Sequence, residues 1–151
     1  AREFFENRDG GSGQYAMNIA ACYNYIGDVC REMKEYQSAL SYYKIAIEKG
    51  TEKVVTNGLG QFYSNVGQMY YFMEKNTEAR TYLEKAIACF EKNGYYWGLE
   101  RAEAYMALVL LRFGEKDQAK KHYKKAVSLT EKMNNPTTVS VIRQISKEAG
   151  F

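Results

Sequence analysis

The sequence predicts an all-α solenoid of three helical hairpins with partial units at both ends, and three observations support this. Residues 23–47, 63–87 and 103–127 align without a gap at a spacing of forty residues. Within each segment, apolar residues follow the i, i+3, i+4, i+7 spacing of one helix face. No stretch alternates apolar with polar residues as a half-buried strand would. Internal repetition of this kind is the sequence signature of a solenoid.

The three segments match in residue size at equivalent places. The small sets are Gly27, Gly67 and Ala107; Ala39, Ala79 and Ala119; and Ala46, Ala86 and Ala126. The large sets are Ile26, Val66 and Met106; Cys30, Tyr70 and Leu110; and Tyr43, Leu83 and Tyr123. This matching predicts that every unit folds in the same way and packs through the same places.

Each segment divides into two helices at a short polar break. The breaks are KEYQS at residues 34–38, EKNTE at 74–78 and GEKDQ at 114–118. Gly114 suits the left-handed residue that ends a helix. Asn76 and Asp117 suit the capping position of the helix that follows. Each unit is therefore predicted to be a helical hairpin.

Gly67 lies inside the first helix of the second unit, where glycine costs about 1 kcal/mol relative to alanine. Two antiparallel helices approach closely only where side chains are small, and Gly67 occupies the face toward the second helix. Ala79 and Ala86 are the small residues of that second helix. We therefore expect Gly67→Leu to overpack the contact and to lower stability by about 1–3 kcal/mol or more.

The expected elements follow one another along a single domain. Residues 1–9 align loosely with the stretch from residue 86 and are expected to be the end of an earlier second helix, followed by the flexible connection RDGGSG. The three repeats cover about residues 15–50, 54–92 and 96–133. Residues 137–149 form either a capping helix or the first helix of a further repeat. The chain is expected to be a fragment of a longer protein.

The repeated pattern resembles the signature of the tetratricopeptide repeats over about residues 15–133. The residues that carry it are Tyr63, Val66, Gly67, Tyr70, Ala79, Leu83 and Ala86. The usual repeat has about 34 residues, and the spacing of forty is similar to a long-helix subclass found in cell-polarity adaptors and in bacterial peptide-sensing and maltose-activator regulators. The stretch YSNVGQMY at residues 63–70 is close to that subclass signature. The resemblance implies a right-handed α-α superhelix without catalysis, in a cytoplasmic, bacterial signalling or regulatory protein.

The resemblance also implies that a protein or peptide binds in the concave groove lined by the first helix of each unit. The residues expected there are Asn24, Tyr25, Asp28, Arg31, Gln61, Ser64, Asn65, Gln68, Tyr71, Arg101 and Tyr105. Their amides can hold both the N–H and the C=O of an extended peptide, their arginines can bind carboxylates, and their tyrosines offer aromatic contact area. In the long-helix subclass, asparagines at these places of the first helices bind the peptide backbone. Here Asn65 matches that feature, and Gln68 is a near match. Chaperone-binding relatives have a dicarboxylate clamp that includes a lysine. In the first unit of this chain the equivalent residue is Asn24, so chaperone tails are not expected partners.

Composition and charge argue against several other classes of function. A formal net charge of +3 gives little support to a nucleic-acid or membrane partner, and no apolar run approaches the roughly 20 residues that cross a bilayer. The three cysteines lack metal-ligand spacing and favour a reducing, cytoplasmic setting. His122, the only histidine, lies among lysines and is expected to be solvated. We therefore expect no catalytic residue, no metal site and no cofactor.

Three alternatives stay open. Residues 116–132 hold six lysines and two acids, which form either a solvated face, the interpretation that we favour, or a basic surface for nucleic acid or an acidic partner. The loop GYYWG at residues 94–98 places Tyr96 and Trp97 either against the third hairpin, as we favour, or in an exposed sticky patch. The chain is also a candidate for self-association through exposed repeat ends, as a homo-oligomer.

Overall fold

A computed structural model describes residues 13–51, 58–94 and 96–151 of the chain. These residues form seven helices and no strand, which confirms the all-α prediction. The helices are α2 (Gly13–Glu32), α3 (Tyr36–Thr51), α4 (Leu59–Phe72), α5 (Asn76–Asn93), α6 (Leu99–Arg112), α7 (Lys116–Met133) and α8 (Pro136–Ala149). The helix expected over residues 1–9 lies outside the described residues.

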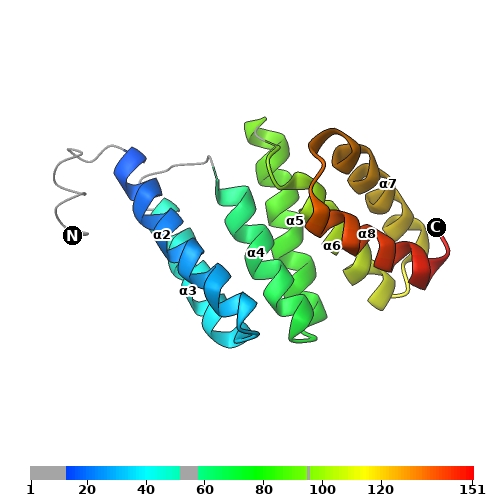
Figure 1. Ribbon diagram of the computed structural model, residues 1–151, viewed down its shortest axis with the longest axis horizontal. Helices are drawn as coiled ribbons and strands as arrows, with labels where there is room; N and C mark the ends of the chain where they lie inside the picture. Colours follow the sequence, from blue (N-terminus) through cyan, green and yellow to red (C-terminus); the bar gives the residue numbers. More distant parts are fainter. Residues whose placement is uncertain (1–12, 52–57, 95) are drawn as a thin grey trace.

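The helices pair into hairpins, α2 with α3, α4 with α5 and α6 with α7, and the hairpins stack side by side (Figure 1). The second helix of each hairpin packs on the first helix of the next, α3 on α4 and α5 on α6. The first helices also contact one another, α4 with α6 and α6 with α8. Over the described ranges, no pair of second helices has a comparable contact. The first helices therefore line the inner, concave side.

The hairpin turns repeat the same backbone conformation every forty residues. Lys34, Glu74 and Gly114 have positive φ values of 60°, 60° and 76°. After each of them, a backbone N–H donates to a carbonyl five residues earlier: Glu35 to Cys30, Lys75 to Tyr70 and Glu115 to Leu110, at 2.9, 2.9 and 3.0 Å. The prediction for Gly114 is confirmed. The first two turns place a residue with a Cβ where glycine is the favoured residue.

The predicted helix caps are wrong. Asn76 is already the first residue of α5, and Asp117 is the second residue of α7. The capping positions hold Lys75 and Glu115, and neither makes a side-chain capping bond. The Asn76 side chain instead accepts a hydrogen bond from Arg112 Nη1 at 3.0 Å, so it joins the second hairpin to the third.

Gly67 lies where the two helices of its hairpin come close together, as predicted. An added Cβ at Gly67 would lie 2.7 Å from Leu83 Cγ and 3.3 Å from the carbonyl oxygen of Ala79. An added Cβ at Gly27, the equivalent place of the first hairpin, would lie 2.6 Å from the ring of Tyr43. Both distances are shorter than a carbon–carbon van der Waals contact of about 3.5–4.0 Å, so the glycine is a packing requirement.

The hydrophobic core is most complete around α6, whose residues from Ala102 to Leu110 are all buried. The last helix, α8, closes this end against α6 and α7. Its buried residues are Thr138, Val141 and Ile145. No helix among the described residues has the length and apolar character of a membrane span.

Candidate functional site

The eleven predicted groove residues differ widely in exposure. Tyr25 is 69% exposed, and Asp28, Arg31, Gln61 and Arg101 are half-buried. The buried members are Asn24, Ser64, Asn65, Gln68, Tyr71 and Tyr105. Whether any of them binds a ligand stays a prediction, but the expectation that all of them line an open surface needs correction.

Polar pairs inside the layer of first helices account for much of this burial. Asn65 Nδ2 donates to Asn24 Oδ1 at 2.8 Å and joins α4 to α2. Gln68 Nε2 donates to Ser64 Oγ at 3.0 Å one turn earlier on α4. These two buried bonds satisfy polar groups that would otherwise be costly to remove from water.

Asp28 is bound to a core residue. The Tyr43 hydroxyl donates to Asp28 Oδ1 at 2.6 Å, which joins α3 to α2. Burial, and then this hydrogen bond to a carboxylate, raise the pKa of Tyr43 above its ordinary value. Asp28 therefore supports the first hairpin, whatever else it contacts.

Tyr71 and Tyr105 form an aromatic cluster, which corrects the expectation that they offer open contact area. Their rings meet edge to face with centroids 5.6 Å apart, and Phe72 contacts both. The guanidinium of Arg112 lies 3.7 Å from the Tyr71 ring centroid, and its Nη1 donates to the Tyr71 carbonyl at 2.7 Å. The cluster thus fastens α4 to α6.

Five of the predicted residues meet in one small polar pocket. Gln61, Ser64, Asn65 and Gln68 of α4 face Arg101 of α6 across a cavity of about 50 Å³. Trp97, Gly98 and Glu100, at the start of α6, and Asn135, before α8, complete its lining. We call this cavity the groove pocket. Because α4, α6 and the start of α8 surround it, it lies on the concave side.

The groove pocket also contains Trp97 and Glu100, which were not among the predicted groove residues. Trp97 is 61% exposed, so the favoured interpretation that it packs against the third hairpin is wrong. Glu100 is buried, and its Oε1 accepts from Asn135 Nδ2 at 3.3 Å. The available signal was the loop GYYWG, whose aromatic residues have no core equivalent in the forty-residue register.

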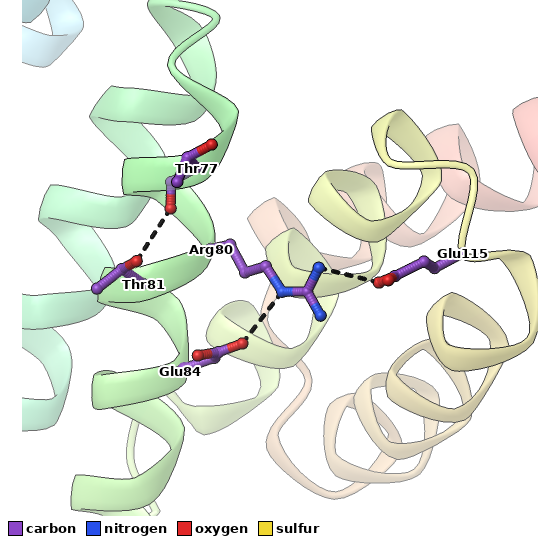
Figure 2. A network of polar contacts seen from close by, with 5 residues as sticks. All are labelled: Thr77, Arg80, Thr81, Glu84 and Glu115. Carbon is purple, nitrogen blue, oxygen red and sulfur yellow. Dashed lines mark hydrogen bonds and ion pairs between the residues drawn. The ribbon is translucent and has the colours of Figure 1, made fainter.

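A larger cleft of about 510 Å³ lies between α5 and the third hairpin. Ile87, Met106 and Leu110 give it an apolar floor. Arg80 also lines this cleft. Figure 2 shows its contacts with Glu84 of the same helix, at 3.1 Å, and with Glu115 of the third hairpin, at 3.0 Å. This ion-pair network connects the second and third hairpins.

His122 also lines this cleft, and the expectation that it is solvated is wrong. Its Nδ1 lies 2.5 Å from Oε2 of Glu103, a residue that is 1% exposed. The lysines that surround it in sequence are exposed on α7: Lys116, Lys120, Lys121, Lys124 and Lys125. Within the described ranges, no group of histidine, cysteine and carboxylate residues has the arrangement of a metal site.

Comparison with known proteins identifies the family. The sequence profile of the tetratricopeptide repeat matches residues 59–132, which hold the second and third hairpins. The chain belongs to the tetratricopeptide-repeat family. The match agrees with the register of Gly67 and Ala107, and with the hairpin stack in Figure 1.

Among its relatives, the tetratricopeptide-repeat chain is 33% identical over 107 residues to Type II methyltransferase M.CeqI of Rhodococcus hoagii. That match covers 71% of this chain and 20% of the relative, so the chain spans about a fifth of that protein's length. The family itself is typically non-catalytic.

Solved structures agree on the fold. The tetratricopeptide-repeat domain of Arabidopsis FLU superposes with a TM-score of 0.71 at 18% identity, covering 78% of this chain and 98% of that one. A Rap protein in complex with Competence and Sporulation Factor superposes with a TM-score of 0.70 at 19% identity, covering 89% of this chain and 41% of that one. The tetratricopeptide-repeat chain is accordingly a helical-repeat scaffold of the kind used for protein interactions.

Proposed function

We propose that this chain is a non-catalytic binding module of a cytoplasmic signalling or regulatory protein, and that it holds an extended peptide segment of its partner in the concave groove. The observation that carries the proposal is the groove pocket, where polar side chains from α4, α6 and the start of α8 converge beside an exposed tryptophan. Amide and carboxylate groups can pair with a peptide backbone, and an exposed indole ring is a common anchor of binding energy.

Two further observations support a peptide as the partner. The Rap neighbour was solved in complex with Competence and Sporulation Factor, so a stack of this shape can hold a partner. The groove pocket has room for one or two groups the size of water, which suits the end of one side chain or one peptide unit of an extended ligand. The proposed domain is the one that the sequence predicts, with a partial preceding unit over residues 1–9, the three repeats and the last helix.

The test is to select peptides that bind the full chain from a random display library. The Kd of each selected peptide is then measured by fluorescence anisotropy with the labelled peptide. Trp97→Ala and Gln61→Ala should weaken binding by about tenfold or more, because both residues line the groove pocket. Gln118→Ala, a matched polar change in the α5 cleft, should leave the Kd unchanged. Peptides whose affinity depends on Gln118 and not on Trp97 would place the binding surface in the cleft and contradict the proposal.

Ionic strength separates this function from the basic-surface alternative. The groove pocket has a single carboxylate and a single guanidinium in its lining, so it predicts a Kd with shallow salt dependence. Binding of a polyanion to the α7 lysines predicts affinity that falls steeply as salt rises. A steep salt dependence of the selected peptides would therefore favour the α7 surface over the groove.

A further inference from the structure

The groove pocket contains two buried hydrogen-bond acceptors without a partner. Gln68 Oε1 and Glu100 Oε2 are both shielded from solvent and accept no hydrogen bond in the structure. The two residues are 0% and 3% exposed, and both line the pocket. Buried polar atoms normally have a partner, so these two mark a place where a donor is missing.

Both acceptors are held in a fixed orientation by the other end of their own side chain. Gln68 Nε2 is bound to Ser64 Oγ at 3.0 Å, which leaves Oε1 as the free atom. Glu100 Oε1 is bound to Asn135 Nδ2 at 3.3 Å, which leaves Oε2 free. Asn135 is itself fixed, because its Oδ1 accepts from the backbone N–H of Thr137 at 3.1 Å.

The size and composition of the pocket select the kind of donor. A cavity of about 50 Å³ holds one or two groups the size of water, which occupies about 30 Å³ in the liquid. An ammonium group has this size, carries three donors and no acceptor, and bears the charge that complements a carboxylate. The exposed ring of Trp97 at the same pocket can cover the ammonium or its methylene chain by a cation–π or apolar contact.

Arg101 lines the same pocket but does not fill this role. Neither Gln68 Oε1 nor Glu100 Oε2 accepts a hydrogen bond from it, and its own Nε is buried without a partner. Glu100 lies in the first turn of α6, where the start of a helix favours a negative charge. The pocket thus keeps two free acceptor oxygens, one of them on a carboxylate, at Gln68 and Glu100.

We propose that the corner formed by Gln68, Trp97 and Glu100 binds the ammonium group of a lysine side chain in the partner peptide. Two hydrogen bonds go to the free oxygens of Gln68 and Glu100, and the methylene chain lies along the indole ring. The proposal rests on the proposed function, because the lysine belongs to a segment that lies in the groove, and it names the side-chain class that the groove prefers.

The probe is Nα-acetyl-lysine methylamide, titrated into the ¹⁵N-labelled full chain and followed by NMR. The indole N–H of Trp97, the single tryptophan, and the side-chain amide of Gln68 are direct reporters of the pocket. Both signals should shift saturably with the lysine probe. The matching norleucine and Nε-acetyl-lysine probes, which lack the charge, should leave them in place.

Two variants and one control locate the site. Glu100→Gln keeps the shape and removes the charge, so the Kd of the lysine probe should rise by at least about tenfold. Trp97→Ala, a change at an exposed residue, should weaken it without altering the melting temperature. Glu91→Gln, an exposed carboxylate on the α5 cleft, should have no effect. Equal shifts with the norleucine probe, no shift with the lysine probe, or tighter binding of Nα-acetyl-arginine methylamide than of the lysine probe would each overturn the assignment.

The outcome separates this proposal from the proposed function. Groove-binding peptides that carry no enriched lysine, and that keep their Kd in Glu100→Gln, would overturn the lysine corner and leave the peptide groove standing. A saturable lysine probe combined with peptides that bind only at the α5 cleft would support the corner and overturn the groove as the peptide site.

Discussion

Replacing Gly67 by alanine should destabilise the second hairpin, although alanine is the better helix former. The added Cβ would lie 2.7 Å from Cγ of Leu83 and 3.3 Å from the carbonyl oxygen of Ala79. Cγ is the branch atom of the leucine side chain, and the carbonyl belongs to the α5 backbone. Rotating the end of one flexible side chain therefore does not relieve the contact, and α4 has to move away from α5.

Two opposing contributions set the size of the effect. Alanine in a helix interior is favoured over glycine by about 1 kcal/mol. Overpacking a core costs about 1–3 kcal/mol. Their difference predicts that Gly67→Ala lowers the free energy of unfolding by up to about 2 kcal/mol. Urea unfolding followed by circular dichroism measures a change of this size, provided that the m-value stays constant.

A double-mutant cycle with Leu83→Ala tests the cause. Leu83 is fully buried, so Leu83→Ala alone should cost about 2–5 kcal/mol. In that background the main obstacle to the Cβ is gone, and Gly67→Ala should become neutral or stabilise by up to about 1 kcal/mol. An equal loss in both backgrounds, or a gain in both, would refute close helix approach as the reason for the glycine.

Ala107→Gly is the matched control in the third hairpin. It occupies the same place in the repeat, where the structure already accommodates a Cβ. It should cost about 1 kcal/mol from helix propensity alone. A much larger loss would mean that the third hairpin depends on this methyl group for packing.

Three further changes test other contacts. Glu74→Gly should raise the free energy of unfolding by about 1 kcal/mol, because φ is 60° there; a lower urea midpoint would contradict the strain. His122→Ala should lower the free energy of unfolding by about 3 kcal/mol, because Glu103 stays buried without its partner. Adding Glu103→Met should restore most of the loss. A double variant that is no more stable than His122→Ala would exclude this cause. Burial and the bond to Asp28 raise the pKa of Tyr43, so its stabilising contribution is complete below the ordinary tyrosine pKa of about 10 and is lost at higher pH, where the unfolded chain loses the proton first. Urea unfolding should therefore show that the free energy of unfolding falls less between pH 9 and pH 11 for Tyr43→Phe than for the unchanged chain. An equal fall in both would argue against this linkage.

The repeat pattern predicted what happens inside each hairpin. The alignment of Gly27 with Gly67, and of Tyr43 with Leu83, describes contacts between two helices joined by a short turn. Such contacts depend on local spacing alone, and the sequence displays that spacing directly. The positive φ at Gly114 is predictable for the same reason.

The contacts between hairpins were much harder to predict. Tyr71 and Tyr105 lie off the inner face of their hairpins, so sequence spacing predicts that they are exposed. The stacking of α4 on α6 buries them instead. One contact inside a hairpin was missed as well: His122 on α7 pairs with Glu103 on α6, because the two helices of the third hairpin bring these positions together. How far one hairpin rotates against the next is set by the packing of many side chains, which no single window of the sequence contains.

The groove pocket was predicted in part. Gln61, Ser64 and Arg101 were placed by register, and the structure brings them to one cavity. Trp97 and Asn135 lie in connections between helices, where the forty-residue register does not apply. Their positions follow from the path of the chain between neighbouring units and not from helix periodicity.

The burial of α6 from Ala102 to Leu110 has a consequence for how the molecule fluctuates. The free energy of local opening rises with the number of buried contacts that must break. Amide protons of α6 should therefore exchange with solvent more slowly than those of α2, whose Tyr25, Ile26 and Val29 are exposed. Glu100 and Arg101 lie on the element that opens last. An incoming ligand therefore meets a receptor that already has its final shape, and little conformational entropy is lost when the two associate.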